Sequence, residues 1–196
     1  MSGYILERTR DGEVLYDIYS RLVKDRIVFV SGEDGIDNDV ATTIAATLLF
    51  LDNQTKNKPI YLYLNSPGGT VSSGLFTIYD TMNYVKSPIY TVCIGEACSS
   101  AAVLLAAGAP GNRMSFPNSM IMIHEVQTAK CNMESNSSLL KRSKLTDKIN
   151  KQLVDTLAKH TKKPAKKIEE LMKEETYFTA EEAKEFGIID KIVTSK

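Results

Sequence analysis

The sequence predicts an α/β fold with a largely parallel sheet, because short apolar strands alternate along the chain with segments of helical spacing. The predicted strands are rich in β-branched and aromatic residues: Ile27 to Val30, Ile60 to Leu64, Ile89 to Ile94 and Met120 to Ile123. The predicted helices between them are Asp39 to Leu51, Ser72 to Tyr84 and Ser100 to Ala107. Alternation of this kind brings strands together in parallel, with the helices as crossovers.

After the fourth strand the pattern changes to one long helix, predicted over Met133 to His160. Its apolar stripe consists of Leu140, Leu145, Ile149, Leu153 and Leu157. An exposed apolar face is unfavourable in water, so this stripe requires a partner surface.

The C-terminal part predicts two short helices and a closing strand. Pro164 suits the first turn of one helix. Thr179 and Glu182 fit a capping box at the start of the last helix, which Gly187 would end. The closing strand is predicted over Ile188 to Val193.

The composition indicates one globular domain over residues 1–196. A chain of this length with 43% hydrophobic residues is long enough for one well-packed domain and too short for two. Lys plus Arg and Asp plus Glu both total 24, so the net charge is zero. No basic field would then hold nucleic acid or an anionic membrane, and neither partner is expected.

Cysteine usage favours a cytoplasmic location. Cys93, Cys98 and Cys131 form no C-x-x-C pair and leave one cysteine unpaired in any disulfide scheme, which suits a reducing compartment. No apolar run approaches the roughly 20 residues of a membrane span, and residues 1–11 lack the basic and apolar blocks of a signal peptide.

Two glycine-containing turns follow apolar strands. Asn65 to Gly69 follows the second strand, and Gly95 to Ser99 follows the third and leads directly into the helix from Ser100. At such a turn a serine hydroxyl lies near a helix N-terminus, where free N–H groups favour developing negative charge. The nucleophile of an acyl transfer gains most there. Ser is also a preferred helix N-cap, so a capping role for Ser99 stays open.

A serine nucleophile needs a base, and the chain contains two histidines. His160 is predicted near the C-terminus of the long helix, where the dipole stabilises a surface histidine, and we assign it no catalytic role. His124 ends a strand, as the Ser99 turn does, so adjacent parallel strands would bring the two together. Strand-end histidines are also often structural, and the residues alone leave both interpretations open.

From Tyr16 onward the sequence resembles the ClpP family of ATP-dependent protease subunits over nearly the whole chain. The segments that resemble the family are Tyr16 to Leu22, Lys24 to Ile27, Leu48 to Leu51, Tyr61 to Gly69, Ile78 to Met82, Ala106 to Ala109, Pro117 to Ser119, Ile121 to His124 and Phe178 to Ala183. The resemblance implies a crotonase-like spiral of ββα units with a protruding handle helix, the handle region covering about residues 125–160.

The resemblance also implies site residues and partners. Ser99 would be the nucleophile and His124 its base, with the backbone N–H groups of Gly69 and Ser100 as oxyanion hole. The implied activity is that of a serine endopeptidase in protein quality control, degrading unfolded polypeptide inside a tetradecamer of two stacked seven-membered rings. A separate AAA+ unfoldase of the ClpX, ClpA or ClpC kind would supply substrate, since this chain has no Walker motif. No metal or cofactor is implied.

The third triad position departs from the family pattern. The family has an aspartate shortly before the stretch equivalent to Phe178 to Ala180, and here Glu175 stands there, with Glu174 as reserve candidate. A glutamate orients an imidazole as an aspartate does, but its extra methylene shifts the carboxylate by about one bond length.

Two more departures flank the expected site. After His124 the family has Gln-Pro and a glycine-rich strand, whereas Glu125 to Asn132 contains no glycine. Cys98 and Ser100 stand beside the nucleophile where Ala and Met are usual, so a Cys98 thiol and a Ser100 hydroxyl remain alternative nucleophiles.

Two rival functions follow. A weakly active structural or regulatory subunit, in a mixed ring with an active paralogue, is favoured by Glu175 and by the altered stretch after His124. A crotonase-type acyl-CoA enzyme would also use two glycine turns as an oxyanion hole, but Ser99 and His124 at their family positions argue against it.

Overall fold

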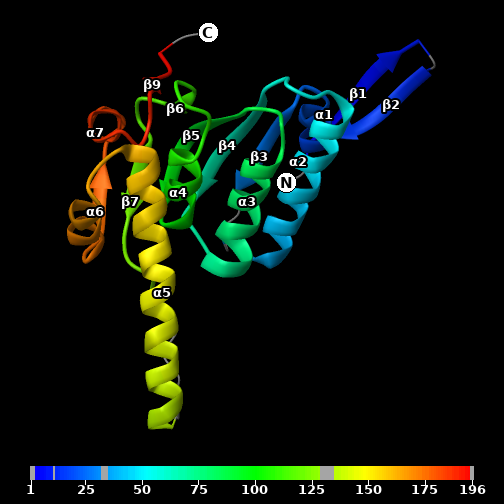
Figure 1. The fold of residues 1–196 in the computed structure, drawn as a ribbon. Helices are drawn as coiled ribbons and strands as arrows, with labels where there is room; N and C mark the ends of the chain where they lie inside the picture. Colours follow the sequence, from blue (N-terminus) through cyan, green and yellow to red (C-terminus); the bar gives the residue numbers. More distant parts are fainter. Residues whose placement is uncertain (1–2, 11, 32–34, 129–134, 195–196) are drawn as a thin grey trace.

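The computed structural model describes residues 3–10, 12–31, 35–128 and 135–194 of a mixed α/β fold (Figure 1). The strands are β1 (Tyr4–Thr9), β2 (Gly12–Asp17), β3 (Ile27–Ser31), β4 (Ile60–Ser66), β5 (Ile89–Cys98), β6 (Arg113–Ser115), β7 (Met120–Ile123), β8 (Thr176–Phe178) and β9 (Lys191–Ile192). The helices are α1 (Ile18–Lys24), α2 (Asn38–Gln54), α3 (Phe76–Tyr84), α4 (Ser100–Ala106), α5 (Asn136–Thr161), α6 (Ala165–Met172) and α7 (Ala180–Phe186). A π-helical turn, η1 (Val71–Leu75), precedes α3.

The main sheet is parallel through β3, β4, β5, β6 and β9, and it forks along β5. The first part of β5 pairs with β6, and the part from Glu96 to Cys98 pairs in parallel with β7. Strand β8 adds antiparallel to β7. Gly95 lies between the two parts of β5 with a φ of 78°, a conformation that glycine adopts without strain. The fork places the ends of β4, β5 and β7 near one another.

The predicted alternation of strands and helices is confirmed. All four predicted strands are present, and β5 extends further than predicted, as far as Cys98. Helices α2, α3 and α4 pack against the sheet (Figure 1), and the core between these layers is fully buried at Leu48, Leu62, Ile78 and Leu104. The sheet therefore forms a rigid frame for the turns at its strand ends.

The predicted signals at the last helix are also confirmed. The Glu182 N–H donates to the Thr179 hydroxyl, and the Thr179 N–H donates to the Glu182 carboxylate at 2.8 Å, which completes the capping box of α7. Gly187 ends the helix with a φ of 94°. The closing strand is shorter than predicted, since β9 covers Lys191–Ile192.

Helix α5 confirms the predicted long helix and projects from the rest of the fold (Figure 1). Its apolar stripe has two parts. Leu153 and Leu157 are 5% and 1% exposed because they pack into the core, whereas Leu140 and Leu145 are 65% and 57% exposed. The predicted helix start at Met133, together with Cys131, lies outside the described residues.

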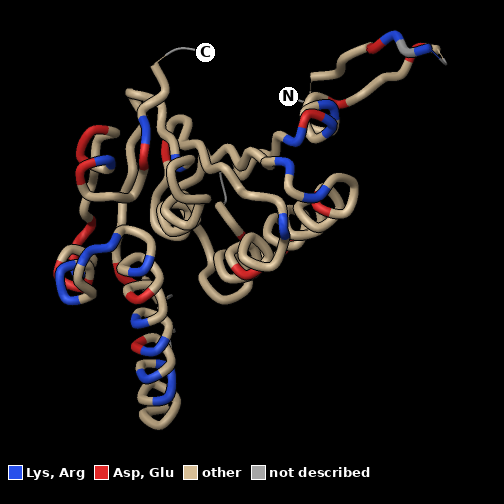
Figure 2. Tube along the Cα trace, turned by 45° about the horizontal axis from the view of Figure 1, so that its top comes forward, with Lys and Arg blue, Asp and Glu red and all other residues tan. Residues whose placement is uncertain are grey.

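Charge is unevenly distributed although the net charge is zero. Lysines and an arginine dominate α5 (Figure 2): Lys141, Arg142, Lys144, Lys148, Lys151 and Lys159, against Asp147 and Asp155. Helix α7 has an excess of acidic residues, with Glu181, Glu182 and Glu185 against Lys184, whereas in α6 two lysines balance two glutamates. Among the described helices, none is both long and apolar enough to span a membrane.

His160 differs from the expectation of a surface histidine. Its side chain is partly buried, and its Nε2 lies 3.1 Å from the Tyr79 hydroxyl. Burial, with the nearby charges of Lys159, Arg113 and Lys162, lowers the pKa of the imidazole from 6.5 to about 4. Desolvation therefore outweighs the favourable helix dipole.

This burial predicts a pH-dependent stability. Between pH 6.5 and about 4 the unfolded chain binds a proton at His160 that the folded chain does not, so stability falls as the pH falls through this window. From pH 7 to pH 5 the loss is expected to be about 1 kcal/mol, well below the full value of the shift, because the half-exposed imidazole is screened by solvent. Urea unfolding at both pH values measures it. His160→Gln should show a smaller difference, and an equal difference in both proteins would contradict the assignment.

Candidate active site

Ser99 lies at a sharp turn between β5 and α4. Its φ of 54° and ψ of −120° are strained for a non-glycine residue, at a cost of about 1–3 kcal/mol. Its N–H donates to the Met122 carbonyl of β7 at 2.7 Å, and its side chain makes no capping hydrogen bond to α4. Ser99 therefore occupies the N-cap position of α4, but its side chain does not cap the helix. A strained strand-to-helix turn is the setting in which hydrolases present a nucleophilic serine.

The glycine turn after β4 lies directly against Ser99. A Cβ on Gly68 would be 2.6 Å from the Ser99 Cβ, and a Cβ on Gly69 would be 2.2 Å from the Ile36 carbonyl oxygen. Neither position has room for a side chain. The Ile36 N–H donates to the Gly68 carbonyl at 2.6 Å, and the Thr70 N–H donates to the Ile36 carbonyl at 2.9 Å, so the turn is held on both sides.

Two backbone donors at these turns are available to a ligand. Within the described part of the chain, the N–H groups of Gly69 and Ser100 have no hydrogen-bond acceptor. Free N–H groups at fixed positions beside a serine are the components of an oxyanion hole. The structure thus brings together the two turns that the sequence singled out.

His124 follows the last residue of β7, whose parallel pairing with β5 was predicted to bring it to Ser99. The two residues line one cavity of about 350 Å³, together with Gly69 and residues of α5. His124 also lines a second cavity of about 460 Å³. A further group of side chains lines this second cavity with His124.

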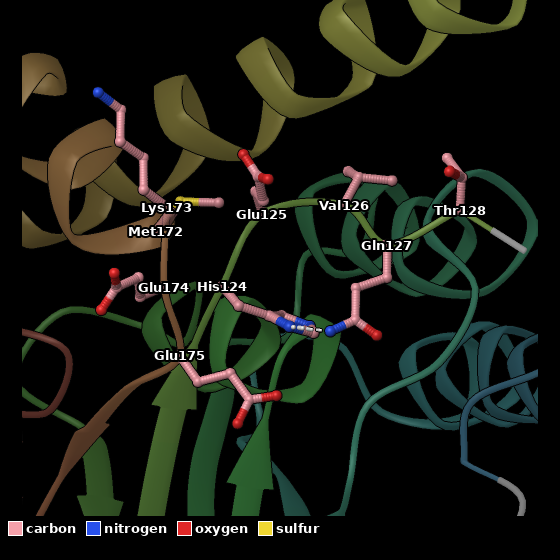
Figure 3. Close-up of a pocket in the computed structure, with 9 residues that line it drawn as sticks. All are labelled: His124, Glu125, Val126, Gln127, Thr128, Met172, Lys173, Glu174 and Glu175. Carbon is pink, nitrogen blue, oxygen red and sulfur yellow. Dashed lines mark hydrogen bonds between the residues drawn. The ribbon is translucent and has the colours of Figure 1, made fainter.

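Glu175 is in that further group (Figure 3). The antiparallel register pairs Ile123 with Thr176, the first residue of β8, which places the preceding Glu175 beside His124. The Glu175 carboxylate accepts a hydrogen bond from the Tyr177 hydroxyl at 2.9 Å, and this bond raises the pKa of Tyr177. Glu174 lines the same cavity but points away from the imidazole, whereas Glu175 extends beneath it (Figure 3).

Gln127 is a site residue that the sequence did not reveal. Its side-chain nitrogen lies 3.2 Å from Nδ1 of His124 (Figure 3). A glutamine three residues past a histidine has no recognisable motif. It contacts the ring because the Glu125 N–H donates to the Met172 carbonyl at 2.7 Å and the Val126 N–H donates to Asn150 at 3.3 Å, which fixes the course of the chain after His124.

The alternative nucleophiles are placed less favourably. Burial raises the pKa of the Cys98 thiol to about 11, with a further contribution from Glu96, so little thiolate forms at neutral pH. The Ser100 hydroxyl is buried without a hydrogen-bond partner, and Ser100 is not among the residues lining the cavity shared by Ser99 and His124.

The arrangement is suited to acyl transfer. A strained serine, a histidine in the same cavity and two free N–H groups supply a nucleophile, a base and oxyanion donors. Among the described residues, no group of three or more His, Cys, Asp or Glu side chains is arranged to hold a metal ion.

A comparison with protein families gives a match over nearly the whole chain. The family model described as Clp protease matches residues 10–196. The match covers both glycine turns, His124, Glu175 and the whole of α5.

Proposed function

The chain belongs to the Clp protease family, and we propose that it is the serine-type proteolytic subunit of a self-compartmentalising, ATP-dependent protease. Its substrate would be unfolded polypeptide supplied by a separate AAA+ unfoldase. Residues 1–196 would form one protease domain, working in stacked rings in the cytoplasm. The observation that supports the serine-type chemistry most strongly is the strained Ser99 in one cavity with His124.

In the proposed mechanism, the Ser99 Oγ attacks the scissile carbonyl carbon while Nε2 of His124 accepts its proton. The carbonyl oxygen gains negative charge and is stabilised by the N–H groups of Gly69 and Ser100. The imidazolium returns the proton to the leaving amine, which leaves an acyl group on Ser99. Water, deprotonated by His124, then attacks this ester, and the imidazolium returns the proton to the Ser99 Oγ as the new carboxylic acid is released.

Glu175 is the proposed carboxylate of the triad. It stands beside His124, and its negative charge would stabilise the imidazolium that forms in each half of the reaction. The Glu175 carboxylate accepts a hydrogen bond from Tyr177, whereas a triad carboxylate accepts one from its histidine. This favours a second candidate function, that of a weakly active subunit in a ring shared with an active paralogue. Labelling of the purified chain with a fluorophosphonate separates the two. A catalytic subunit is labelled at Ser99, and a scaffold subunit is not.

The exposed part of α5 supports the assembly of rings. Leu140 and Leu145 project into solvent, although apolar side chains of this size are normally covered. Leu145→Lys is expected to shift the chain from a double ring toward smaller species, because a charge would be buried in the contact. Native mass spectrometry measures the distribution. Leu145→Met should keep the wild-type assembly, and an unchanged assembly in Leu145→Lys would refute a contact at this residue.

A further inference from the structure

The contact between Gln127 and His124 occupies the ring atom that the third member of a triad normally holds. Gln127 lies 3.2 Å from Nδ1, while the Glu175 carboxylate is bonded to Tyr177 (Figure 3). In a Ser–His–carboxylate triad, the group at Nδ1 fixes the orientation and the tautomer of the imidazole. In this chain an amide is at that position.

We propose that Gln127 is a positioning residue for His124, an inference that rests on the proposed serine-protease function. In the structure the amide nitrogen faces Nδ1. Turned by 180° about its last side-chain bond, the amide would accept a hydrogen bond from Nδ1–H through its carbonyl oxygen. The lone pair of Nε2 is then free to accept the proton of Ser99. The oxygen and the nitrogen of a side-chain amide are assigned from their hydrogen bonds. A histidine with its proton on Nδ1 therefore requires the amide oxygen to face the ring.

A neutral amide is chemically adequate for this role. In the Cys-His-Asn arrangement of papain-like proteases an amide orients the catalytic imidazole without a negative charge. Orientation and charge stabilisation are thus separable tasks. In this chain Gln127 would orient the ring, and Glu175 would contribute its charge from the same cavity without a direct bond.

The backbone around Gln127 is fixed well enough to define the contact. Glu125 and Val126 are hydrogen-bonded to Met172 and Asn150, so two elements, α6 and α5, hold the segment between His124 and Gln127. The Gln127 side chain itself is exposed to solvent. A substitution there is therefore expected to alter the ring contact without disturbing the core.

Several charged groups line the cavity next to His124 and set its electrostatic background. They come from the segment after β7 and from the segment between α6 and β8: Glu125, Lys173, Glu174 and Glu175. Substitution of Gln127 by an isosteric apolar residue leaves these charges unchanged. Its effect would then report on orientation alone.

The test compares Gln127→Met, which keeps the side-chain length, with Gln127→Glu, which restores an acceptor for Nδ1–H. Gln127→Met is expected to lower kcat by roughly tenfold to a hundredfold with KM within about twofold, since small misplacements of catalytic groups have effects of this size. Labelling of Ser99 by a fluorophosphonate should slow by the same factor. Gln127→Glu should recover most of kcat. Gln54→Met, at the exposed end of α2, is the matched control and should resemble wild type.

Three results would overturn the proposal in different ways. If wild type is labelled at Ser99 and Gln127→Met reacts as fast as wild type or faster, Gln127 does not position the histidine, and the proposed function stands. If wild type is not labelled at Ser99, the serine-protease function fails and the role of Gln127 fails with it. Failure of Gln127→Glu to recover activity while Gln127→Met is impaired would also contradict the proposal, because the contact would then be steric.

Discussion

Replacing Ser99 with alanine is expected to reduce peptide hydrolysis by at least about a thousandfold, because the attacking oxygen is removed. Folding should be unaffected. The Ser99 side chain makes no capping hydrogen bond, and alanine has the same steric restriction at a φ of 54° as serine. The measurements are hydrolysis of a short fluorogenic peptide and labelling by a fluorophosphonate.

Ser100→Ala and Cys98→Ser are the matched controls, because they remove the other two candidate nucleophiles. Both should keep activity of the same order as wild type. Ser100 would still supply its backbone N–H, and Cys98 is a buried thiol of high pKa. Retained turnover in purified Ser99→Ala would show that another residue attacks the substrate.

The approach of His124 to Ser99 was predictable because it depends on the backbone. Each residue follows an apolar strand, and parallel neighbouring strands end at one edge of a sheet. The same reasoning holds for the glycine turn after β4. Such placements follow from strand direction and order, which apolar patterning indicates.

The side-chain partners in the site were not predictable in the same way. Glu175 and Tyr177 are two residues apart along an extended segment, so their side chains lie on the same side of it. The Glu175 carboxylate therefore bonds to the Tyr177 hydroxyl, which competes with His124 for it. The Gln127 contact depends on two hydrogen bonds that hold the preceding residues to α5 and α6. Neither contact can be predicted from a local sequence pattern.

The hairpin of β1 and β2 shows a different limit. Among the described residues, its two strands pair with each other and with no further strand. Most of their side chains are exposed, so they lack the buried apolar pattern that marked the other strands. The available signal was the dipeptide Asp11-Gly12, which favours a tight hairpin turn.

Replacing Gly69 with alanine is expected to lower kcat/KM by at least about a hundredfold, because removing an oxyanion donor from its position has effects of this size. The new Cβ would lie 2.2 Å from the Ile36 carbonyl oxygen and 2.5 Å from the Ile36 nitrogen. Both are backbone atoms, so the turn must move, and the Gly69 N–H moves with it.

The matched control is Gly111→Ala, since Gly111 also has a positive φ, of 81°, but a Cβ there would meet no atom within 4 Å. It imposes the conformational cost of alanine at positive φ, about 1–2 kcal/mol, without a collision. Gly111→Ala should therefore lower the melting temperature but keep kcat/KM within about twofold. Kinetics on well-folded Gly69→Ala, with circular dichroism as a check on folding, make the comparison. Equal kcat/KM in the two variants would show that the position of the Gly69 N–H does not matter for turnover, and the oxyanion hole would have to be formed by other donors.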